Sequence, residues 1–248
     1  MRTVFRTFFR LLIGSFCLSL LYLIACKWIL PPLTLTQLAD RLQGKTVRYQ
    51  PVSYENMAPD MKLAVLAAED QLFPVHKGFD WRAVRESLNG ERGGKKGNRP
   101  VGAAASTISQ QTAKNVFLWQ GKGSSRYVRK VLEIPYTWLI ENIWGKQRIL
   151  EVYLNVAQMG DGIYGVEAAA GVYFRKTAAQ LSRAEAAHIA AALPNPVIYT
   201  VKPVSAYVRR KSAWVQKQMA NLRGYEKIRE LIDPKKPTNL SNKTHGNQ

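Results

Sequence analysis

The sequence predicts an all-α domain that follows a single N-terminal transmembrane helix. From Ser106 onward, apolar residues recur at intervals of three and four, which is the spacing of helices that bury one face. Strand signals are nearly absent along the chain. Hydrophobic residues make up 46% of the 248 residues, which is enough to build a core.

The N-terminal element is predicted to be a membrane anchor over residues 11–30. Three arginines within residues 1–10 precede an uncharged apolar run, and Lys27 can extend the span because its amine snorkels to the interface. The arginines place residues 1–10 in the cytoplasm and the remainder of the chain outside it. A cleaved signal peptide and, at residues 23–26, a lipoprotein cleavage box are the alternatives.

One domain is expected beyond the anchor, preceded by a connector of mixed polar and apolar residues and followed by a polar tail. Residues 31–51 form a connector with a short helix at 36–42 and an extended piece at 46–51. The domain itself covers residues 52–234. The tail at 235–248 is polar and contains Pro and Asn, so it is predicted to be disordered.

The first helix of the domain is predicted to begin at Pro59, a residue favoured at the first helical position, and to end near Glu69. A second helix begins near Asp80, and the Gly-rich, charged residues 89–100 predict a mobile basic loop. The buried face of the first helix comprises Met61, Ala64, Val65 and Ala68.

Five further helices are predicted from the periodicity beyond Ser106. The last of them has a capping box, Ser182 with Glu185 three residues later, and Pro194 stops it. The predicted helices span residues 107–117, 127–144, 146–157, 166–174 and 182–193.

The charge balance indicates an anionic partner. Lys and Arg total 36 against 17 Asp and Glu, so the net charge is +19 and the pI about 10.1. Nucleic acid, an anionic membrane surface and a phosphorylated substrate all fit this balance. Both cysteines, Cys17 and Cys26, lie in the apolar N-terminal segment, so no disulfide is expected in the domain, and the three histidines lack the spacing of a zinc site.

Glu69 is the first candidate for catalysis. A carboxylate near the last turn of a buried helix meets the negative end of the helix dipole and loses hydration, and both effects raise its pKa. Such effects bring the pKa of a carboxylate closer to neutral pH, where it can act as a general base. The alternative is that Glu69 and Asp70 form a solvated pair at a helix end.

A second group of candidates lies between Ser106 and Asn115, where hydroxyls open a helix and amides and a lysine follow. The free backbone amides of a helix start bind anions, and Gln111 and Lys114 share one helical face because they are three residues apart. The alternative is that Ser106 is only an N-cap and that the glutamines are surface residues.

A third group places Arg129 and Glu133 four residues apart, on one helical face. This spacing usually means a surface ion pair, but the apolar flanks of the helix favour partial burial, where an Arg beside a Glu suits a phosphate-bearing substrate. In the next helix, Glu151 and Asn155 also share a face and are interpreted as structural.

These blocks, in this order, resemble the peptidoglycan glycosyltransferases of family 51, as found in class A penicillin-binding proteins and in monofunctional transglycosylases. The resemblance covers residues 52–196 and includes a fifth block at 160–174. The matching residues of the first four blocks are Glu69, Asp70, Phe73, His76 and Gly78; Ser106, Thr107, Gln110, Gln111, Lys114 and Asn115; Arg129, Lys130 and Glu133; and Lys146, Ile149, Glu151, Tyr153, Leu154 and Asn155.

The resemblance implies a lysozyme-like helical domain with a smaller lobe that dips into the membrane. It implies polymerisation of lipid II, with the growing glycan strand as the second substrate and membrane lipid and other cell-wall synthesis and division proteins as partners. The chain would be a single-pass protein of the bacterial cytoplasmic membrane, with its catalytic domain outside. Nucleic acid is not expected as a partner, since an outward-facing domain rarely meets it.

The resemblance also implies residue roles. Glu69 would be the general base, and Glu133 a second essential carboxylate that orients cations or recruits a divalent ion to a pyrophosphate. No cofactor is required, and no metal-ligating residue is assigned. Substrate binding would involve Asp70, Phe73, His76, Ser106, Thr107, Gln111, Lys114, Asn115, Arg129 and Lys130.

Two features qualify the resemblance. Ala104 stands where the family usually has Gly, which predicts retuned activity if that position needs a positive φ. No Ser is followed three residues later by Lys, and no Lys-Thr-Gly occurs, so the transpeptidase motifs are absent and no transpeptidase activity is expected.

Two other functional classes stay open. A lytic, lysozyme-like glycosidase would also use a Glu in a helical fold, but it needs no basic pyrophosphate site. A non-enzymatic basic membrane protein is supported only by the charge of +19. For the polymerase that the resemblance implies, the basic residues at 92–99 and after Lys202 are expected either to hold the domain against anionic headgroups beside the lipid substrate or simply to aid solubility.

Overall fold

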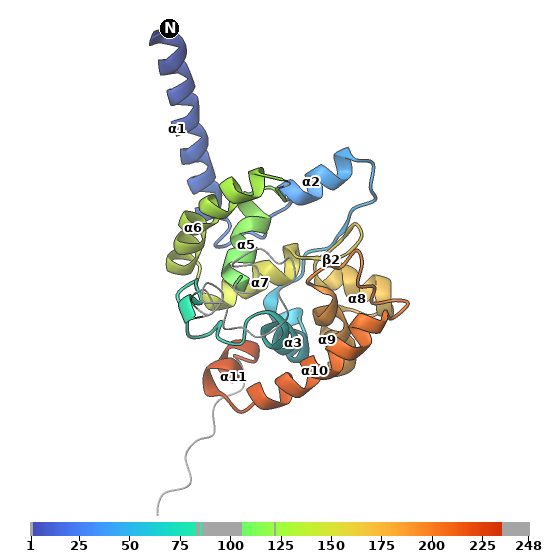
Figure 1. Ribbon diagram of the computed structural model, residues 1–248. Helices are drawn as coiled ribbons and strands as arrows, with labels where there is room; N and C mark the ends of the chain where they lie inside the picture. The colour runs from blue at the N-terminus through green and yellow to red at the C-terminus, as the bar shows by residue number, and fades with distance from the viewer. Residues whose placement is uncertain (1, 83–84, 86–105, 122, 235–248) are drawn as a thin grey trace, which may run out of the picture.

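The computed structural model describes residues 2–82, 85, 106–121 and 123–234, and it is mainly helical, as predicted (Figure 1). The predicted basic loop at 89–100, Ala104 and the tail at 235–248 lie outside the described residues, as does most of the helix expected from Asp80. The helices are α1 (Arg2–Ala25), α2 (Leu35–Leu42), α3 (Pro59–Glu69), α5 (Ile108–Phe117), α6 (Ser125–Ile143), α7 (Lys146–Val156), α8 (Val166–Phe174), α9 (Arg183–Ala192), α10 (Ala206–Leu222) and α11 (Glu226–Ile232), with short 3₁₀ turns at Tyr54–Asn56 and Ala178–Gln180.

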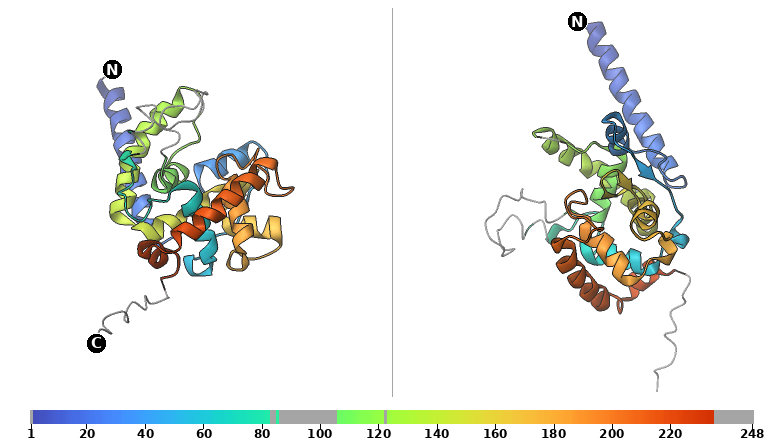
Figure 2. Two further views of the ribbon diagram at one scale, coloured as in Figure 1. Left: turned by 60° about the horizontal axis from the view of Figure 1, so that its bottom comes forward. Right: turned by 90° about the vertical axis from the view of Figure 1, so that its right-hand side faces the viewer.

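Helix α1 extends away from the body of the molecule, and only its C-terminal end is docked (Figures 1 and 2). Leu23 and Cys26 are 0% and 2% exposed, so Cys26 packs in the core of the domain. Trp144 Nε1 donates to the Leu23 carbonyl at 2.9 Å, and the Arg148 guanidinium donates to the Cys26 carbonyl at 3.0 and 2.9 Å. In the part of the chain that the structure describes, no helix is both long and apolar enough to cross a membrane, so the predicted transmembrane helix is not confirmed.

Helix α3 is the centre of the core. It begins at Pro59 as predicted, but the expectation of a single buried face is wrong, because all seven residues from Met61 to Ala67 are buried. Helices α9, α10 and α11 pack against it. The buried residues include Lys62, whose amine donates to the Ile232 carbonyl at 3.3 Å and lies 3.8 Å from the centre of the Tyr54 ring. Glu69, at its end, therefore projects from a rigid element.

A three-stranded sheet of very short strands accompanies the helices. The central strand β3 (Ile163–Tyr164) pairs in parallel with β1 (Arg48–Tyr49) and antiparallel with β2 (Gln158–Gly160). Strand β1 lies within the extended piece predicted at 46–51. The other two strands were not predicted, because two or three residues are too few to show an alternating pattern.

The helices predicted beyond Ser106 are confirmed to within one or two residues at each end. Helices α10 and α11 were not predicted, because the residues after Lys202 were interpreted only as a basic stretch. Helix α10 is capped by the Ser205 side chain, which accepts from the Val208 amide. Its buried residues recur at helical spacing, and they are Val208, Ser212, Val215, Met219 and Leu222.

Glu151 and Asn155 of α7 have the structural role that was predicted for them. Asn155 exchanges hydrogen bonds with the backbone of Val52 at 2.8 and 2.9 Å, and Glu151 accepts from the Tyr54 amide at 3.0 Å. These contacts fix the chain segment that leads into α3.

Candidate active site

Glu69 is the last residue of α3 and is partly buried. Gln111 of α5 donates through Nε2 to Glu69 Oε2 at 2.8 Å. The Tyr153 hydroxyl of α7 donates to Gln111 Oε1 at 3.3 Å, which turns the amide nitrogen of Gln111 towards the carboxylate. Three helices thus hold one carboxyl group in a defined orientation.

Burial raises the pKa of the Glu69 carboxyl, and the neighbouring Asp70 charge adds to this. The hydrogen bond from Gln111 and the positive charges of Lys211 and Lys114 act in the opposite direction and lower the pKa. The net pKa is raised. A carboxyl of this kind holds a proton more tightly than an ordinary Glu, as a general base requires.

Asp70, which directly follows Glu69, is buried and belongs to a ring of hydrogen bonds at the start of α5. Its Oδ2 accepts from the Ile108 amide at 3.0 Å and lies 2.8 Å from His76 Nε2. His76 Nδ1 accepts from the Gly78 amide at 3.0 Å, which leaves the ring proton on Nε2 for Asp70. Thr107, the N-cap of α5, donates to the Gly78 carbonyl at 2.6 Å and closes the ring.

Lys146 extends this network towards α6. Its amine lies 2.6 Å from Glu141 Oε1 and 4.5 Å from the centre of the Phe73 ring. The same oxygen of Glu141 also accepts a hydrogen bond from the Ser109 hydroxyl. Burial lowers the pKa of Lys146, and Glu141 opposes that effect. Phe73 itself is fully buried, so it supports the site from within the core.

A second charged cluster surrounds Glu133, which is only 1% exposed. Arg129 Nη1 pairs with one carboxylate oxygen, and Lys130 Nζ lies 2.9 Å from the other. The Nε of Arg129 is buried and has no hydrogen-bond partner among the described residues. The partial burial predicted for this pair is confirmed, and the Nε–H of Arg129 is a buried donor that the described residues leave unsatisfied.

Lys114 connects the two parts of the site. Burial and the nearby Arg129 charge lower its pKa, whereas the charges of Glu133 and Glu69 raise it, so the amine lies within the electrostatic reach of both carboxylates. The remaining predicted residues lie on the same helix or at its start: Asn115 is buried and Ser106 is partly buried.

Lys211 is a member of the site that the sequence analysis did not assign. It belongs to α10, is partly buried, and interacts electrostatically with Glu69. Its amine lies 3.6 Å from the centre of the Trp214 ring. The helical pattern of α10 could have been recognised, but its packing beside α3 depends on long-range contacts that one sequence does not show.

The described residues include no cluster of three or more His, Cys, Asp or Glu side chains that could hold a metal ion. The anion-binding capacity of the site comes from its cations, because Lys114, Arg129 and Lys130 gather around the single carboxylate of Glu133. Beside them stands a carboxyl group with a raised pKa. The arrangement suits an enzyme that moves a proton next to a multiply charged anion.

Comparison with known proteins identifies the class. The family model described as Transglycosylase matches residues 36–220, so the chain belongs to the transglycosylase family. Among its relatives, a protein of Mannheimia succiniciproducens named biosynthetic peptidoglycan transglycosylase is 51% identical over 176 residues, which is 71% of this chain and 69% of the relative.

Two relatives with the same name are similar over nearly their whole length. The one from Shewanella oneidensis is 44% identical over 225 residues, covering 89% of this chain and 93% of the relative. The one from Pseudomonas aeruginosa is 40% identical over 239 residues, covering 93% and 99%. All the predicted site residues lie within the span that matches the family.

Proposed function

We propose that this protein polymerises the glycan strands of peptidoglycan. The 4-hydroxyl of lipid II attacks the anomeric carbon of the growing strand, forms a β-1,4 bond with inversion, and releases undecaprenyl pyrophosphate. Family membership and the names of the relatives support this reaction. The observation that carries it is the adjacency of a carboxyl with a raised pKa and a polycationic site, the two elements that such a transfer needs.

Glu69 is the general base in this proposal. It takes the proton from the acceptor hydroxyl as the new bond forms, and Gln111 orients the carboxylate for that step. A positioned base contributes typically about 10²–10⁴-fold in rate. The proton leaves with Glu69, so the hydroxyl oxygen carries no full negative charge into the new glycosidic bond.

Lys114, Arg129 and Lys130 hold the pyrophosphate and stabilise the negative charge that grows on it as the glycosidic bond breaks. The Nε–H of Arg129 is a buried donor without a partner among the described residues, and a small movement of the side chain would bring it to a phosphate oxygen. Each charge-assisted hydrogen bond of this kind contributes about 1.5–3 kcal/mol. Glu133 orients the cations in this account, because both of its oxygens are already paired with Arg129 and Lys130.

The remaining substrate-binding assignments divide into two groups. Gln111 touches the base directly, and Ser106 and Asn115 stay assigned to substrate binding. Asp70, His76, Thr107 and Phe73 act from beneath the site, since their polar atoms or rings are engaged in the network that fixes α5.

We further propose that α1 anchors the protein in the bacterial cytoplasmic membrane, with the N-terminus inside and the lobe containing α6 against the lipid. Large apolar side chains are exposed along both helices. Those of α1 include Leu11, Leu18 and Leu21, and those of α6 include Tyr127, Val131 and Trp138. Contiguous exposed apolar surface of this kind marks a membrane or protein contact.

The two helices are also connected, because Ser19 of α1 and Tyr136 of α6 share a 2.5 Å hydrogen bond. Helix α10 lies at the end of the body away from α1 (Figure 1), so the expected headgroup contact of the basic residues after Lys202 does not fit this orientation.

Incubation of the full-length protein with lipid II alone tests the proposed function. The expected product is a glycan polymer that lysozyme digests. A lytic glycosidase would leave lipid II unchanged and act on finished murein, and that pattern would refute the proposal. Glu230→Gln is a suitable control variant, because this exposed side chain of α11 lies outside both the site and the predicted anchor.

A further inference from the structure

Helix α2 exposes its apolar face and buries its polar face, which is the reverse of the arrangement expected beside water. Leu35, Leu38 and Leu42 share one face, the leucine face, because they recur at intervals of three and four residues, and they are 46%, 38% and 81% exposed. The buried side chains of α2 are polar, and they are Thr36, Gln37 and Asp40. Single exposed leucines are common on protein surfaces, but a whole face of them on a helix of eight residues indicates an apolar contact.

Polar contacts hold α2 in this orientation. The Tyr164 hydroxyl of β3 donates to Asp40 Oδ2 at 2.7 Å, and Lys45 Nζ lies 3.4 Å from Asp40 Oδ1. Gln120 Nε2 donates to the Thr36 hydroxyl at 3.4 Å. A rotation of α2 that hid the leucine face would break these contacts and leave the buried Asp40 carboxylate without its partners. The leucines can therefore be covered only from outside the domain.

The position of α2 indicates what covers this face. Only residues 31–34 separate α2 from the end of the predicted anchor at residue 30. Because a chain extends at most about 3.6 Å per residue, α2 begins within about 18 Å of the point where the anchor leaves the hydrocarbon. The connection is fixed to the domain, since the Tyr49 hydroxyl donates to the Pro31 carbonyl at 2.6 Å. Figure 1 shows α2 at the end of the body from which α1 projects.

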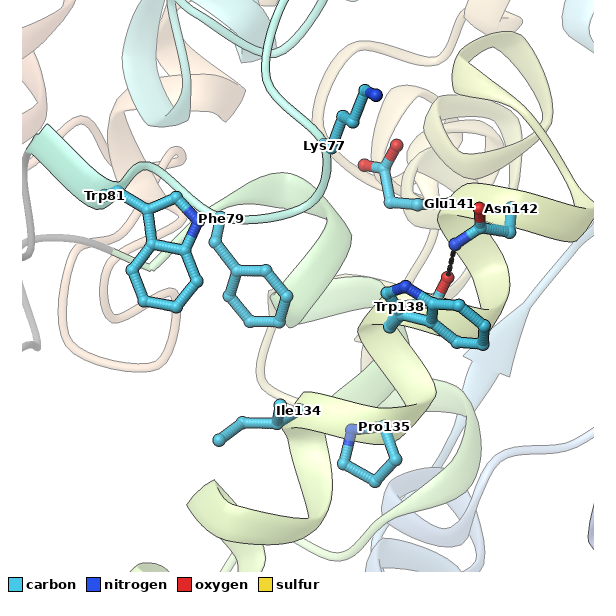
Figure 3. A pocket seen from close by; sticks show the side chains of 8 residues that line it. All are labelled: Lys77, Phe79, Trp81, Ile134, Pro135, Trp138, Glu141 and Asn142. Carbon is cyan, nitrogen blue, oxygen red and sulfur yellow. Dashed lines mark hydrogen bonds between the residues drawn. The ribbon is translucent and has the colours of Figure 1, made fainter.

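The leucine face is separate from the apolar surface of α6. Figure 3 shows that Ile134, Pro135 and Trp138 of α6 face Phe79 and Trp81 across an open pocket. The leucines of α2 are not among the residues that line this pocket. They form a patch of their own, so the placement of α1 and α6 against the lipid does not account for them.

The charges beside the leucine face match an anionic bilayer. Arg41 is exposed and borders this face, because it follows Leu38 by three residues. Arg48, in the strand that follows α2, is also exposed. Helices that lie in a membrane interface combine an apolar face with cations that reach the phosphate groups of the lipids.

We propose that α2 is an interfacial helix, whose leucine face lies among the acyl chains of the bilayer while Arg41 reaches the headgroups. The inference rests on the membrane anchor proposed for α1, and it adds a contact that an anchor alone does not require. Three contacts, at α1, α2 and α6, fix the tilt of the domain, because two would leave it free to rotate about the line that joins them. Glu69 is then held at a constant distance from the membrane surface.

Fluorescent labels on single cysteines test this contact in the full-length protein, reconstituted into vesicles of phosphatidylethanolamine and phosphatidylglycerol. Cys17→Ser removes the exposed native thiol, and this variant without an added cysteine gives the background from the buried Cys26. Leu38→Cys and Leu42→Cys probe the leucine face, and Leu21→Cys probes the exposed surface of α1. The matched control is Leu72→Cys, at a leucine that is 46% exposed and lies beside α11, at the end of the body away from α1 (Figure 1).

Lipids with brominated acyl chains quench a label that contacts the hydrocarbon. We expect the loss of fluorescence in Leu38→Cys and Leu42→Cys to be at least about threefold larger than in Leu72→Cys, and comparable to the loss in Leu21→Cys. Iodide, which quenches labels from the water, should give the opposite order.

Losses at the two α2 positions no larger than in Leu72→Cys would overturn the inference. Protection from iodide without quenching by bromine would also overturn it, and would assign the leucine face to a protein contact. Quenching in Leu21→Cys alone would refute this inference and keep the anchor, whereas quenching at α2 alone would refute the anchor and keep the interfacial helix. Because the assay needs no turnover, failure of the wild type to polymerise lipid II would refute the proposed function alone.

Discussion

Gly121 is expected to determine the position of Arg129, and its replacement by alanine tests the pyrophosphate site. The backbone at Gly121 has a φ of +67°, and an added Cβ would lie 2.9 Å from Arg129 Nε and 3.1 Å from Arg126 Cα. The first distance is too short to persist, so the guanidinium must move. Gly123, two residues later, has a φ of +56° and nothing within 4 Å of an added Cβ.

Comparison of the Gly121→Ala and Gly123→Ala variants separates the effect of backbone strain from the effect of displacing Arg129. A left-handed alanine costs about 1–2 kcal/mol at either position, so both variants should lose stability, and Gly121→Ala should lose somewhat more because its Cβ also crowds the Arg126 backbone. Only Gly121→Ala moves the guanidinium. The loss of one charge-assisted hydrogen bond, about 1.5–3 kcal/mol, corresponds to a fall of roughly 10–100-fold in kcat/KM.

The assay is kcat/KM for lipid II polymerisation, with urea denaturation as the measure of stability. Gly121→Ala should lower kcat/KM by the amount above, while Gly123→Ala stays within about threefold of the wild type. In an Arg129→Ala background, Gly121→Ala should cause no additional loss, because the group it displaces is gone. Equal losses in the two glycine variants, or additive losses with Arg129→Ala, would refute the reasoning.

Three further predictions concern the carboxylates. Lys211→Met should shift the acid limb of the pH–rate profile to higher pH, because removal of a nearby cation raises the pKa of Glu69 further. Lys211→Arg keeps the positive charge and should leave the acid limb in place. An acid limb that does not move in Lys211→Met would exclude this coupling between Lys211 and Glu69. Asp70→Asn should lower the free energy of unfolding by about 1–3 kcal/mol in urea denaturation, since Ile108 and His76 lose a charged acceptor. The control Asp161→Asn, at an exposed position, should have little effect. Glu69→Gln should raise Tm at neutral pH, because a carboxyl with a raised native pKa destabilises the fold when it ionises. The gain in Tm should vanish below about pH 4, where the carboxyl is protonated in both the folded and the unfolded protein. A gain that persists at that pH would contradict this explanation.

Much of the local structure could be predicted from the sequence because it depends on neighbouring residues. The capping box of Ser182 and Glu185 is formed as predicted, and Pro59 is the first residue of α3. The Arg129–Glu133 pair follows from helical spacing alone. In each case, the interacting groups lie within one turn of helix, where the spacing fixes the geometry.

The contacts that assemble the site could not be predicted in this way. Gln111 meets Glu69 across 42 residues of sequence, and Lys211 approaches the same carboxyl from α10. The resemblance implied a substrate-binding role for Asp70, and the sequence did not indicate that its carboxylate would accept from the Ile108 amide at the start of α5, 38 residues later. Packing determines these contacts, and a single sequence does not specify it.

The central claim is that Glu69 removes the proton from the acceptor hydroxyl. The most direct test is the single-turnover rate of lipid II polymerisation for the wild type, Glu69→Gln and the control Glu230→Gln, which alters an exposed carboxylate of α11. The expected result is a fall of about 10²–10⁴-fold for Glu69→Gln, with substrate binding retained and the control unchanged. A rate for Glu69→Gln within about threefold of the wild type would contradict the claim.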